Sequence, residues 1–302
     1  MTTLINCQQV TKYFGAKCAL NQVSFQCESG RPIALIGPNG AGKTTLFSIL
    51  CGFIPASSGQ IEILGHPAGD NALFDKLSAL PQDAQMDPDI MISRQLAFYA
   101  ELKGMNIKAA QHEADRVLEM MGLDEVKQAL PKMLSHGMKK RAAIAQALIG
   151  KPQLVLLDEP TAGLDPANAK VIRELISQLA GQTTFLISSH NLQELERLCD
   201  QVLYLDKGIN KDMTTAVEPV SSEYEYLSIR LIQYAEGPFI DLVKSLQGVE
   251  QVHSPHKNEF KIRFRSTEQQ DLDLLLLQKI KANGWSYQQL TVGETLEDRL
   301  FD

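Results

Sequence analysis

The stretch that decides the fold is residues 134–166, LSHGMKKRAAIAQALIGKPQLVLLDEPTAGLDP. Near its centre, residues 154–157 form a continuous apolar run, as expected for a strand that is buried on both faces of a sheet. Asp158 and Glu159 follow directly, so their carboxylates should lie where that strand ends. Two acids at a strand end are most often solvated, but they also suit phosphate chemistry on a metal ion. The rest of the chain decides between these interpretations.

Apolar runs of the same kind occur at residues 32–36, 184–188 and 202–205, with helical patterns between them. Continuous apolar strands separated by helices indicate a sheet that is covered on both faces, and we predict an α/β domain over residues 1–210. Residues 87–134 carry helical periodicity without a strand-like run. We expect a helical subdomain at about 87–150, closed by a helix that begins near Ser135.

Residues 211–224 are polar, with Thr, Ser and Pro and no sustained period, which predicts a linker. The remainder, 225–302, contains strand patterns at 226–233, 249–265 (a hairpin) and 287–292, and helix patterns at 238–248, 270–284 and 295–302. Two strand–helix–strand units of this length predict a small α+β domain of the ferredoxin-like kind. No metal-ligand set or nucleophile pattern assigns a chemistry to it.

Residues 37–45, GPNGAGKTT, match the phosphate-loop pattern GxxxxGK[ST] and lie between a predicted strand and a predicted helix. Glycines allow the backbone N–H groups of such a loop to face phosphates, and the helix N-terminus adds positive potential. The phosphate-binding candidates are Gly37, Pro38, Asn39, Gly40, Ala41, Gly42, Lys43, Thr44 and Thr45. Lys43 is predicted to reach the β- and γ-phosphates, and Thr44 to ligate magnesium.

The loop changes the interpretation of the two acids. In chain order with it, Asp158 is predicted to be a magnesium partner and Glu159 the general base that polarises the attacking water.

Three further residues gain significance from their order in the chain. Gln82, at the border of the helical subdomain, is predicted to contact magnesium or the attacking water and to sense how the subdomains are turned. His190 ends an apolar run and is predicted to contact the γ-phosphate and orient Glu159. Tyr13 is predicted to stack on an adenine ring. The alternatives are a solvated loop amide, a structural histidine and a core aromatic residue.

These motifs resemble the nucleotide-binding subunits of ABC transporters. The resemblance covers about residues 4–207 and consists of motifs in the family's order: the Tyr13 aromatic loop, the phosphate loop, the Gln82 loop, the LSHGM signature at 134–138, LVLLDEP at 154–160, GLD at 163–165 and the Ser189-His190 switch.

The resemblance implies a head-to-tail pair of such domains with two ATP molecules, and Mg²⁺, between them. Ser135 and Gly137 would bind the γ-phosphate held by the other subunit, and Asp165 would bridge the two sites. The implied partners are an integral membrane permease and a second ATP-binding subunit, in a homodimer or a heterodimer. The implied location is the cytoplasmic face of a membrane.

The signature departs from the family's commonest form, LSGGQ, at His136 and Met138. With the basic residues 139–141 that follow, this variant looks like that of exporter-type subunits whose membrane partners are separate polypeptides. The C-terminal domain ending in LEDRLF resembles the tail of the same subgroup.

Composition disfavours several other classes. The 302 residues carry a net charge of −7, which argues against a broad nucleic-acid-binding surface, so no nucleic acid is expected as a partner. No apolar run approaches the roughly 18 to 20 residues of a membrane span and no secretory signal opens the chain, so we expect it to be soluble. The cysteines, Cys7, Cys18, Cys27, Cys51 and Cys199, lack metal-ligand spacing and are expected to be reduced thiols.

Two alternatives to a transporter subunit remain open. A soluble ABC ATPase acting on ribosomes or DNA is disfavoured by the single cassette, the compact helical segment and the absence of a cysteine cluster. A regulatory protein that binds ATP without hydrolysing it is disfavoured by the presence of both Glu159 and His190.

Overall fold

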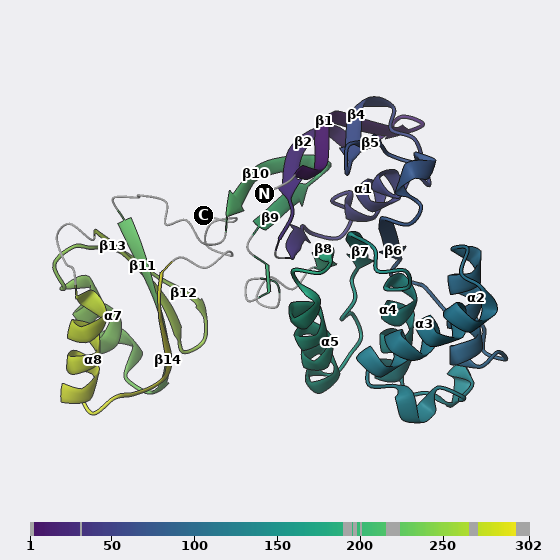
Figure 1. Ribbon diagram of the computed structural model, residues 1–302. Helices are drawn as coiled ribbons and strands as arrows, with labels where there is room; N and C mark the ends of the chain where they lie inside the picture. Colours follow the sequence, from purple (N-terminus) through teal and green to yellow (C-terminus); the bar gives the residue numbers. More distant parts are fainter. Residues whose placement is uncertain are drawn as a thin grey trace. The chain divides into compact units, whose positions relative to one another are not determined.

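The structure, a computed structural model, describes residues 3–30, 32–189, 195, 198–199, 201–215, 224–265 and 271–293. The chain forms two compact units, Met1–Val217 and Glu218–Asp302, which we call the N-terminal and C-terminal units (Figure 1).

The larger sheet of the N-terminal unit has the strand order β10-β9-β3-β8-β7-β6. Its strands are β3 (Ile33–Ile36), β6 (Leu77–Leu80), β7 (Leu154–Asp158), β8 (Thr184–Ser189), β9 (Gln201–Asp206) and β10 (Ile209–Thr215). All neighbours pair in parallel except the edge strand β10, which is antiparallel to β9. The strands β3, β7 and β8 are buried along their whole length, as their continuous apolar sequences predict. Their carboxyl ends therefore meet at one edge of the sheet.

A second, antiparallel sheet has the order β2-β1-β4-β5 and consists of β1 (Thr3–Phe14), β2 (Lys17–Glu28), β4 (Ser58–Ile63) and β5 (His66–Pro67). Helix α1 (Lys43–Leu50) contributes Leu46, Phe47 and Leu50 to one apolar core that also takes in side chains of both sheets. This core fixes α1, and with it the phosphate loop, against the end of β3.

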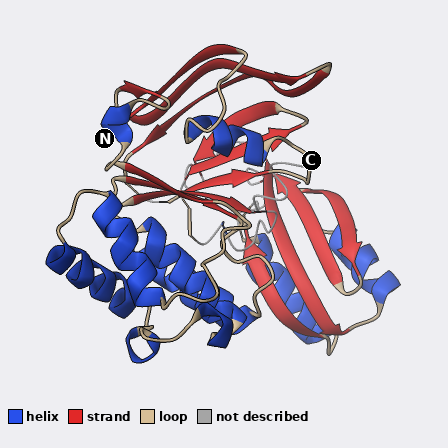
Figure 2. Ribbon diagram, turned by 90° about the vertical axis from the view of Figure 1, so that its right-hand side faces the viewer, coloured by secondary structure: helices blue, strands red, loops and turns tan. Residues whose placement is uncertain are grey.

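The helical subdomain consists of α2 (Ile92–Leu102), α3 (Ile107–Met120) and α4 (His136–Ala147), with short 3-10 turns at Asp124–Val126 and Pro131–Met133. These helices lie together beside the larger sheet (Figure 2), and α5 (Pro166–Leu179) follows β7. Helix α4 begins where the sequence predicts, because the Ser135 hydroxyl accepts a hydrogen bond from the Met138 N–H at 3.2 Å and so caps it.

The linker predicted at 211–224 is wrong at both ends, because residues 211–215 belong to β10 and Tyr224 begins β11. An edge strand is held by backbone hydrogen bonds to one neighbour only, so it can be polar and show no hydrophobic period. Residues 216–223, the terminal helix predicted at 295–302 and His190 lie outside the described residues.

The C-terminal unit contains β11 (Tyr224–Gln233), α7 (Glu236–Lys244), β12 (Val249–His256), β13 (Glu259–Arg265), α8 (Leu272–Ala282) and β14 (Ser286–Val292). Its antiparallel sheet has the order β12-β13-β11-β14, and α7 and α8 lie side by side on it (Figure 1). This is the β-α-β-β-α-β arrangement of a ferredoxin-like fold, as the sequence indicated. The helices pack on Phe260, Ile262 and Phe264, so the alternating sequence EFKIRFR places its apolar residues in the core.

None of the helices in the described ranges has the length and apolar character needed to cross a membrane.

Candidate functional site

A pocket of about 490 Å³ lies where β3 leads into α1. The residues that line it are Phe14, Lys17, Cys18, Ala19, Asn39, Gly40, Ala41, Gly42, Lys43, Thr44, Thr45, Gln82, Asp158, Glu159 and Lys207. Most members of the predicted phosphate loop therefore face one cavity together with Gln82 and both acids.

Two loop glycines are required by space as well as by backbone conformation. A Cβ on Gly37 would lie 2.0 Å from the Leu205 carbonyl oxygen, and one on Gly42 would lie 2.7 Å from the Ala19 carbonyl oxygen. Both glycines also have φ between +100° and +160°, a region that other residues rarely adopt. The loop can take this close path only with glycine at both positions.

Lys43 is the buried one of the three lysines that line the pocket, since Lys17 and Lys207 are exposed. Its side chain folds back across the loop, where Nζ donates to the Gly37 carbonyl at 2.6 Å and to the Pro38 carbonyl at 3.3 Å. Lys43 is only 7% exposed, so its ammonium group lies inside the concave side of the loop. A buried cation beside the N-terminus of α1 fits an anionic phosphate.

Asp158 is held by two hydroxyl groups. Thr44 Oγ1 donates to Asp158 Oδ2 at 3.2 Å, and Ser188 Oγ donates to Asp158 Oδ1. The same Ser188 oxygen accepts the Glu159 N–H at 2.9 Å. The register of β7 and β8 explains this contact, since Asp158 and Ser188 are direct partners in the two parallel strands.

Glu159 lies just beyond the end of β7 with a left-handed φ of 49° and is 6% exposed. Such a backbone conformation costs a non-glycine residue roughly 1 to 2 kcal/mol. The Ser188 hydrogen bond helps to hold it, and the turn points the chain out of the sheet toward the pocket that Glu159 lines. Strain of this kind is typical of functional positions.

A magnesium ion fits these donors. Thr44 and Asp158 supply neighbouring hydroxyl and carboxylate oxygens, the ligand type that Mg²⁺ prefers, and Gln82 lines the same pocket. Among the described residues no group of three or more His, Cys, Asp or Glu side chains could hold a metal. Mg²⁺ usually takes only one or two protein carboxylates and completes its shell with water and substrate phosphates, so this sparse donor set is sufficient.

The aromatic residue at the pocket is Phe14, whereas the sequence analysis predicted Tyr13. Phe14 lines the cavity and Tyr13 does not, because neighbouring side chains of a strand point to opposite faces. The Lys12 Nζ atom lies 5.2 Å from the centroid of the Phe14 ring. The structure therefore favours Phe14 as the candidate for stacking on a flat base.

Besides Tyr13, the predicted residues Gly37 and Pro38 of the phosphate loop do not line this pocket, and neither do Ser135, Gly137 and Asp165. Ser135 caps α4, and Asp165 caps α5 by accepting the Ala167 and Asn168 N–H groups at 3.1 and 3.0 Å. Hydrogen bonds from the side chain and backbone of Asn168 lower the pKa of Asp165. Ser135, Gly137 and Asp165 are thus built into two helix N-termini and not into the phosphate site of their own chain.

Comparison with known proteins identifies the arrangement. Residues 20–162 match the protein family described as ABC transporter. Over 303 aligned residues the chain is 31% identical to the linearmycin resistance ATP-binding protein LnrL of Bacillus subtilis (strain 168), which covers 99% of this chain and 97% of that protein. This chain belongs to the ATP-binding proteins of ABC transporters. It is an ATP-binding subunit with ATPase activity.

Other relatives agree with this assignment. The ATP-binding subunit is 37% identical over 207 residues to the Nod factor export ATP-binding protein I of Burkholderia lata, covering 68% of each chain. Among solved structures it resembles cbiO1 from Clostridium perfringens, part of the ABC transporter complex cbiONQ, with a TM-score of 0.63 and 25% identity over 72% of this chain and 90% of that one. A dimeric post-hydrolysis cassette bound to ADP and Pi, MJ0796, has the same fold with a TM-score of 0.65 at 23% identity, covering 72% of this chain and 100% of that one.

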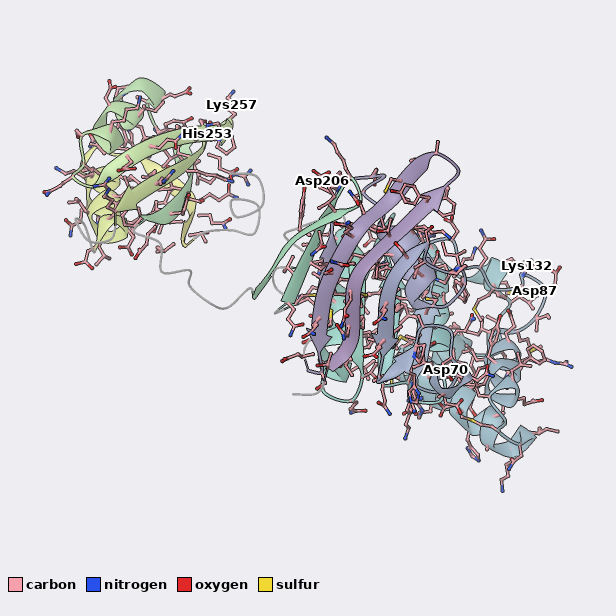
Figure 3. The ribbon with its side chains drawn as sticks, turned by 90° about the horizontal axis from the view of Figure 1, so that it is seen from above. Asp70, Asp87, Lys132, Asp206, His253 and Lys257 are labelled. Carbon is pink, nitrogen blue, oxygen red and sulfur yellow. The ribbon has the colours of Figure 1, made fainter. Side chains whose placement is uncertain are left out.

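A second cavity of the ATP-binding subunit, of about 470 Å³, lies beside the helical subdomain. It is lined by Gln82, Asp83, Ala84, Gln85, Met86, Pro88, Pro131, Lys132, His136, Lys139 and Lys140. Lys132, labelled in Figure 3, lines this cavity, and its Nζ lies 2.7 Å from Asp89 Oδ1. Gln82 lines this cavity as well as the nucleotide pocket, and Lys140 Nζ donates to the Gln82 carbonyl at 3.3 Å.

No sequence motif indicates two residues of the site, Phe14 at the pocket and Ser188 beside Asp158. The choice between two adjacent aromatics depends on which face of β1 each one occupies, and β1 has several register shifts that hide this alternation. Ser188 precedes the predicted switch residues Ser189 and His190. Its role follows from the register of two strands, which the sequence does not contain.

Proposed function

We propose that this ATPase subunit drives export by a separate integral membrane permease, and that it works at the cytoplasmic face of the membrane in a pair of ATP-binding subunits. The observation that carries the proposal is the similarity to LnrL over nearly the whole of both chains, C-terminal unit included. The relatives named for Nod factor export support the same direction of transport. The substrate would be selected by the permease.

In each subunit, we assign ATP binding to the pocket over the phosphate loop. The backbone of residues 37–45 and the Lys43 ammonium group bind the phosphates, and Phe14 stacks on the base. Thr44 and Asp158 would hold Mg²⁺, with Gln82 lining the same pocket, and the ion would supply neutralising charge for the β- and γ-phosphates. Ser188 keeps the Asp158 carboxylate oriented toward Thr44.

Glu159 is the general base in this proposal. It is fixed at the end of β7 and lines the pocket, so its carboxylate can accept a proton from a water that attacks the γ-phosphate. His190, which follows Ser189 in the chain, is proposed to contact the γ-phosphate and to orient Glu159.

Ser135, Gly137 and Asp165 are proposed to serve the nucleotide of the second subunit. They do not line the pocket of their own chain, and Ser135 is exposed at the N-terminus of α4, where the helix dipole favours an anion. A γ-phosphate bound from both sides would close the pair, and its hydrolysis would release it. With Lys43, Glu159 and Gly137 all present, a homodimer with two active sites is the simplest assembly.

The permease is proposed to bind in the cavity between the Gln82 loop and the helical subdomain. Because Gln82 lines both this cavity and the nucleotide pocket, a partner seated there can respond to the state of the nucleotide.

Affinity purification of the tagged chain from solubilised membranes tests the proposal. We expect an integral membrane protein to co-purify. Met86→Glu, which places a charge in the cavity, should reduce its recovery at least several-fold, whereas the matched control Ile107→Glu should not, since Ile107 is 77% exposed and does not line the cavity. If the tagged chain co-purified with ribosomes or DNA and never with a membrane protein, the transport proposal would be contradicted.

A further inference from the structure

Asn168, in the first turn of α5, lies between the signature segment and Asp165. Its side-chain Nδ2 donates to Asp165 Oδ2 at 2.6 Å, while its backbone N–H donates to Asp165 Oδ1 at 3.0 Å. Both carboxylate oxygens of Asp165 are thus engaged by the same residue, and the carboxamide group of Asn168 is fixed in one orientation.

The other side of that carboxamide rests against Gly137. A Cβ on Gly137 would lie 2.4 Å from Asn168 Oδ1 and 2.5 Å from Asn168 Cγ, closer than real Cβ contacts. Gly137 is buried in α4 and has an ordinary helical backbone conformation. Its lack of a side chain therefore matters because it leaves room for the Asn168 carboxamide. A larger residue at position 137 would therefore displace the Asn168 side chain of its own subunit.

The same two segments also come close at a second point. A Cβ on Gly163, two residues before Asp165, would lie 3.5 Å from His136 Nε2 at the start of α4. The loop that carries Asp165 therefore lies near the N-terminus of α4 at two places.

We propose that Asn168 is a positioning residue that fastens the signature end of α4 to Asp165, so that both groups reach the second subunit as one rigid surface. The proposal rests on the proposed function in one respect, the assignment of Ser135, Gly137 and Asp165 to the nucleotide of the partner. Asn168 cannot move away from Gly137 without breaking its bond to Asp165, and this is what couples the two motifs. None of this involves the pocket of the same chain, which Asn168 does not line.

The Asn168→Ala variant separates positioning from folding. In this variant Asp165 can still accept hydrogen bonds from the backbone N–H groups of residues 167 and 168, so the N-terminus of α5 should remain capped and the helix intact. We expect kcat for ATP hydrolysis to fall roughly three- to tenfold, as for the loss of one solvent-exposed hydrogen bond, with KM for MgATP within about twofold of the parent. Lys170→Ala is the matched control, because Lys170 lies on the same helix at 70% exposure and should change neither value. Parent kcat in Asn168→Ala would overturn the positioning role.

A double-mutant cycle tests the contact itself. Gly137→Ala should lower the thermal unfolding midpoint and the ATPase rate, and adding Asn168→Ala should recover at least half of the loss in the midpoint and raise the rate above that of Gly137→Ala alone. Additive effects, with the double variant no better than Gly137→Ala, would refute the proposal. If the parent protein hydrolysed no ATP, the proposed function would fail, while the unfolding midpoints of the same variants would still decide whether Asn168 restricts residue 137.

Discussion

At the scale of single residues, the site depends on one serine hydroxyl that serves two acids. Ser188 is fully buried, donates to Asp158 and accepts from the Glu159 backbone N–H. It therefore fixes the carboxylate proposed to hold magnesium and the backbone from which the proposed base projects.

Ser188→Ala should lower kcat for ATP hydrolysis by roughly 10- to 100-fold, because a buried N–H and a carboxylate each lose a partner worth about 1 to 3 kcal/mol. Ser188→Thr, which keeps the hydroxyl, should retain more activity than Ser188→Ala. Steady-state ATPase assays with both variants measure this, and equal activity in the two would mean that the hydroxyl has no catalytic consequence.

The cysteines differ sharply in their environments, which allows a chemical test of the nucleotide pocket. Cys18 is exposed and lines that pocket, whereas burial raises the pKa of the Cys27 and Cys51 thiols to about 12, with the Asp158 carboxylate also raising that of Cys51. Since the thiolate is the reactive form, iodoacetamide should label Cys18 first in the native protein. MgATP should slow this labelling at least several-fold. Peptide mapping by mass spectrometry would contradict the assignment of the pocket if the rate at Cys18 did not respond to MgATP.

At the scale of elements, the end of α4 is attached to the other helices of the subdomain. Arg116 Nη2 donates to the Leu148 carbonyl at 3.0 Å, and Lys103 Nζ donates to the Ile149 carbonyl at 2.8 Å. The Glu113 carboxylate accepts a hydrogen bond from the Gly150 N–H at 2.8 Å and two more from Nε and Nη2 of Arg116. One carboxylate thus links α3 to the segment that leads into β7.

Glu113→Gln should lower the free energy of unfolding by about 1 to 3 kcal/mol near neutral pH. Burial raises the pKa of Glu113, but the hydrogen bonds from Arg116 and Gly150 and the charges of Arg116 and Lys151 outweigh it, so the pKa lies below its ordinary 4.5. A lowered folded pKa means that the carboxylate stabilises the protein above pH 4.5 and that this contribution disappears as the pH falls through the folded value. Urea unfolding of parent and variant should therefore converge as the pH falls below 4.5, and a difference independent of pH would contradict this account.

The sequence predicts those elements whose own residues carry the signal. Strands β3, β7 and β8 are buried on both faces, so their apolar runs mark them, and the phosphate loop is marked by its glycines. Residues 211–215 of the edge strand β10 resemble a linker because they are polar and show no hydrophobic period, although they belong to a strand that pairs with β9. The choice of Phe14 over Tyr13 and the role of Ser188 depend on strand register, and the fit of Asn168 against Gly137 depends on how two helices cross. Such relations arise from tertiary packing and leave no local pattern.

At the scale of the whole molecule, we propose that the two sets of motifs serve two different nucleotides. The phosphate loop, Gln82, Asp158 and Glu159 meet in one pocket, whereas Gly137 and Asp165 lie on either side of Asn168 and Ser135 caps the helix that carries Gly137. If each chain supplies half of two ATP sites, binding of ATP stabilises the dimer, and hydrolysis of ATP favours its dissociation.

The Glu159→Gln variant tests this central claim most directly. Glutamine keeps the shape of the side chain but cannot accept the proton of the attacking water, so ATP should bind without being hydrolysed. Light scattering coupled to size exclusion should then show a dimer with MgATP and a monomer with MgADP or without nucleotide. A variant that binds MgATP and stays monomeric, or that hydrolyses ATP at the parent rate, would contradict the account.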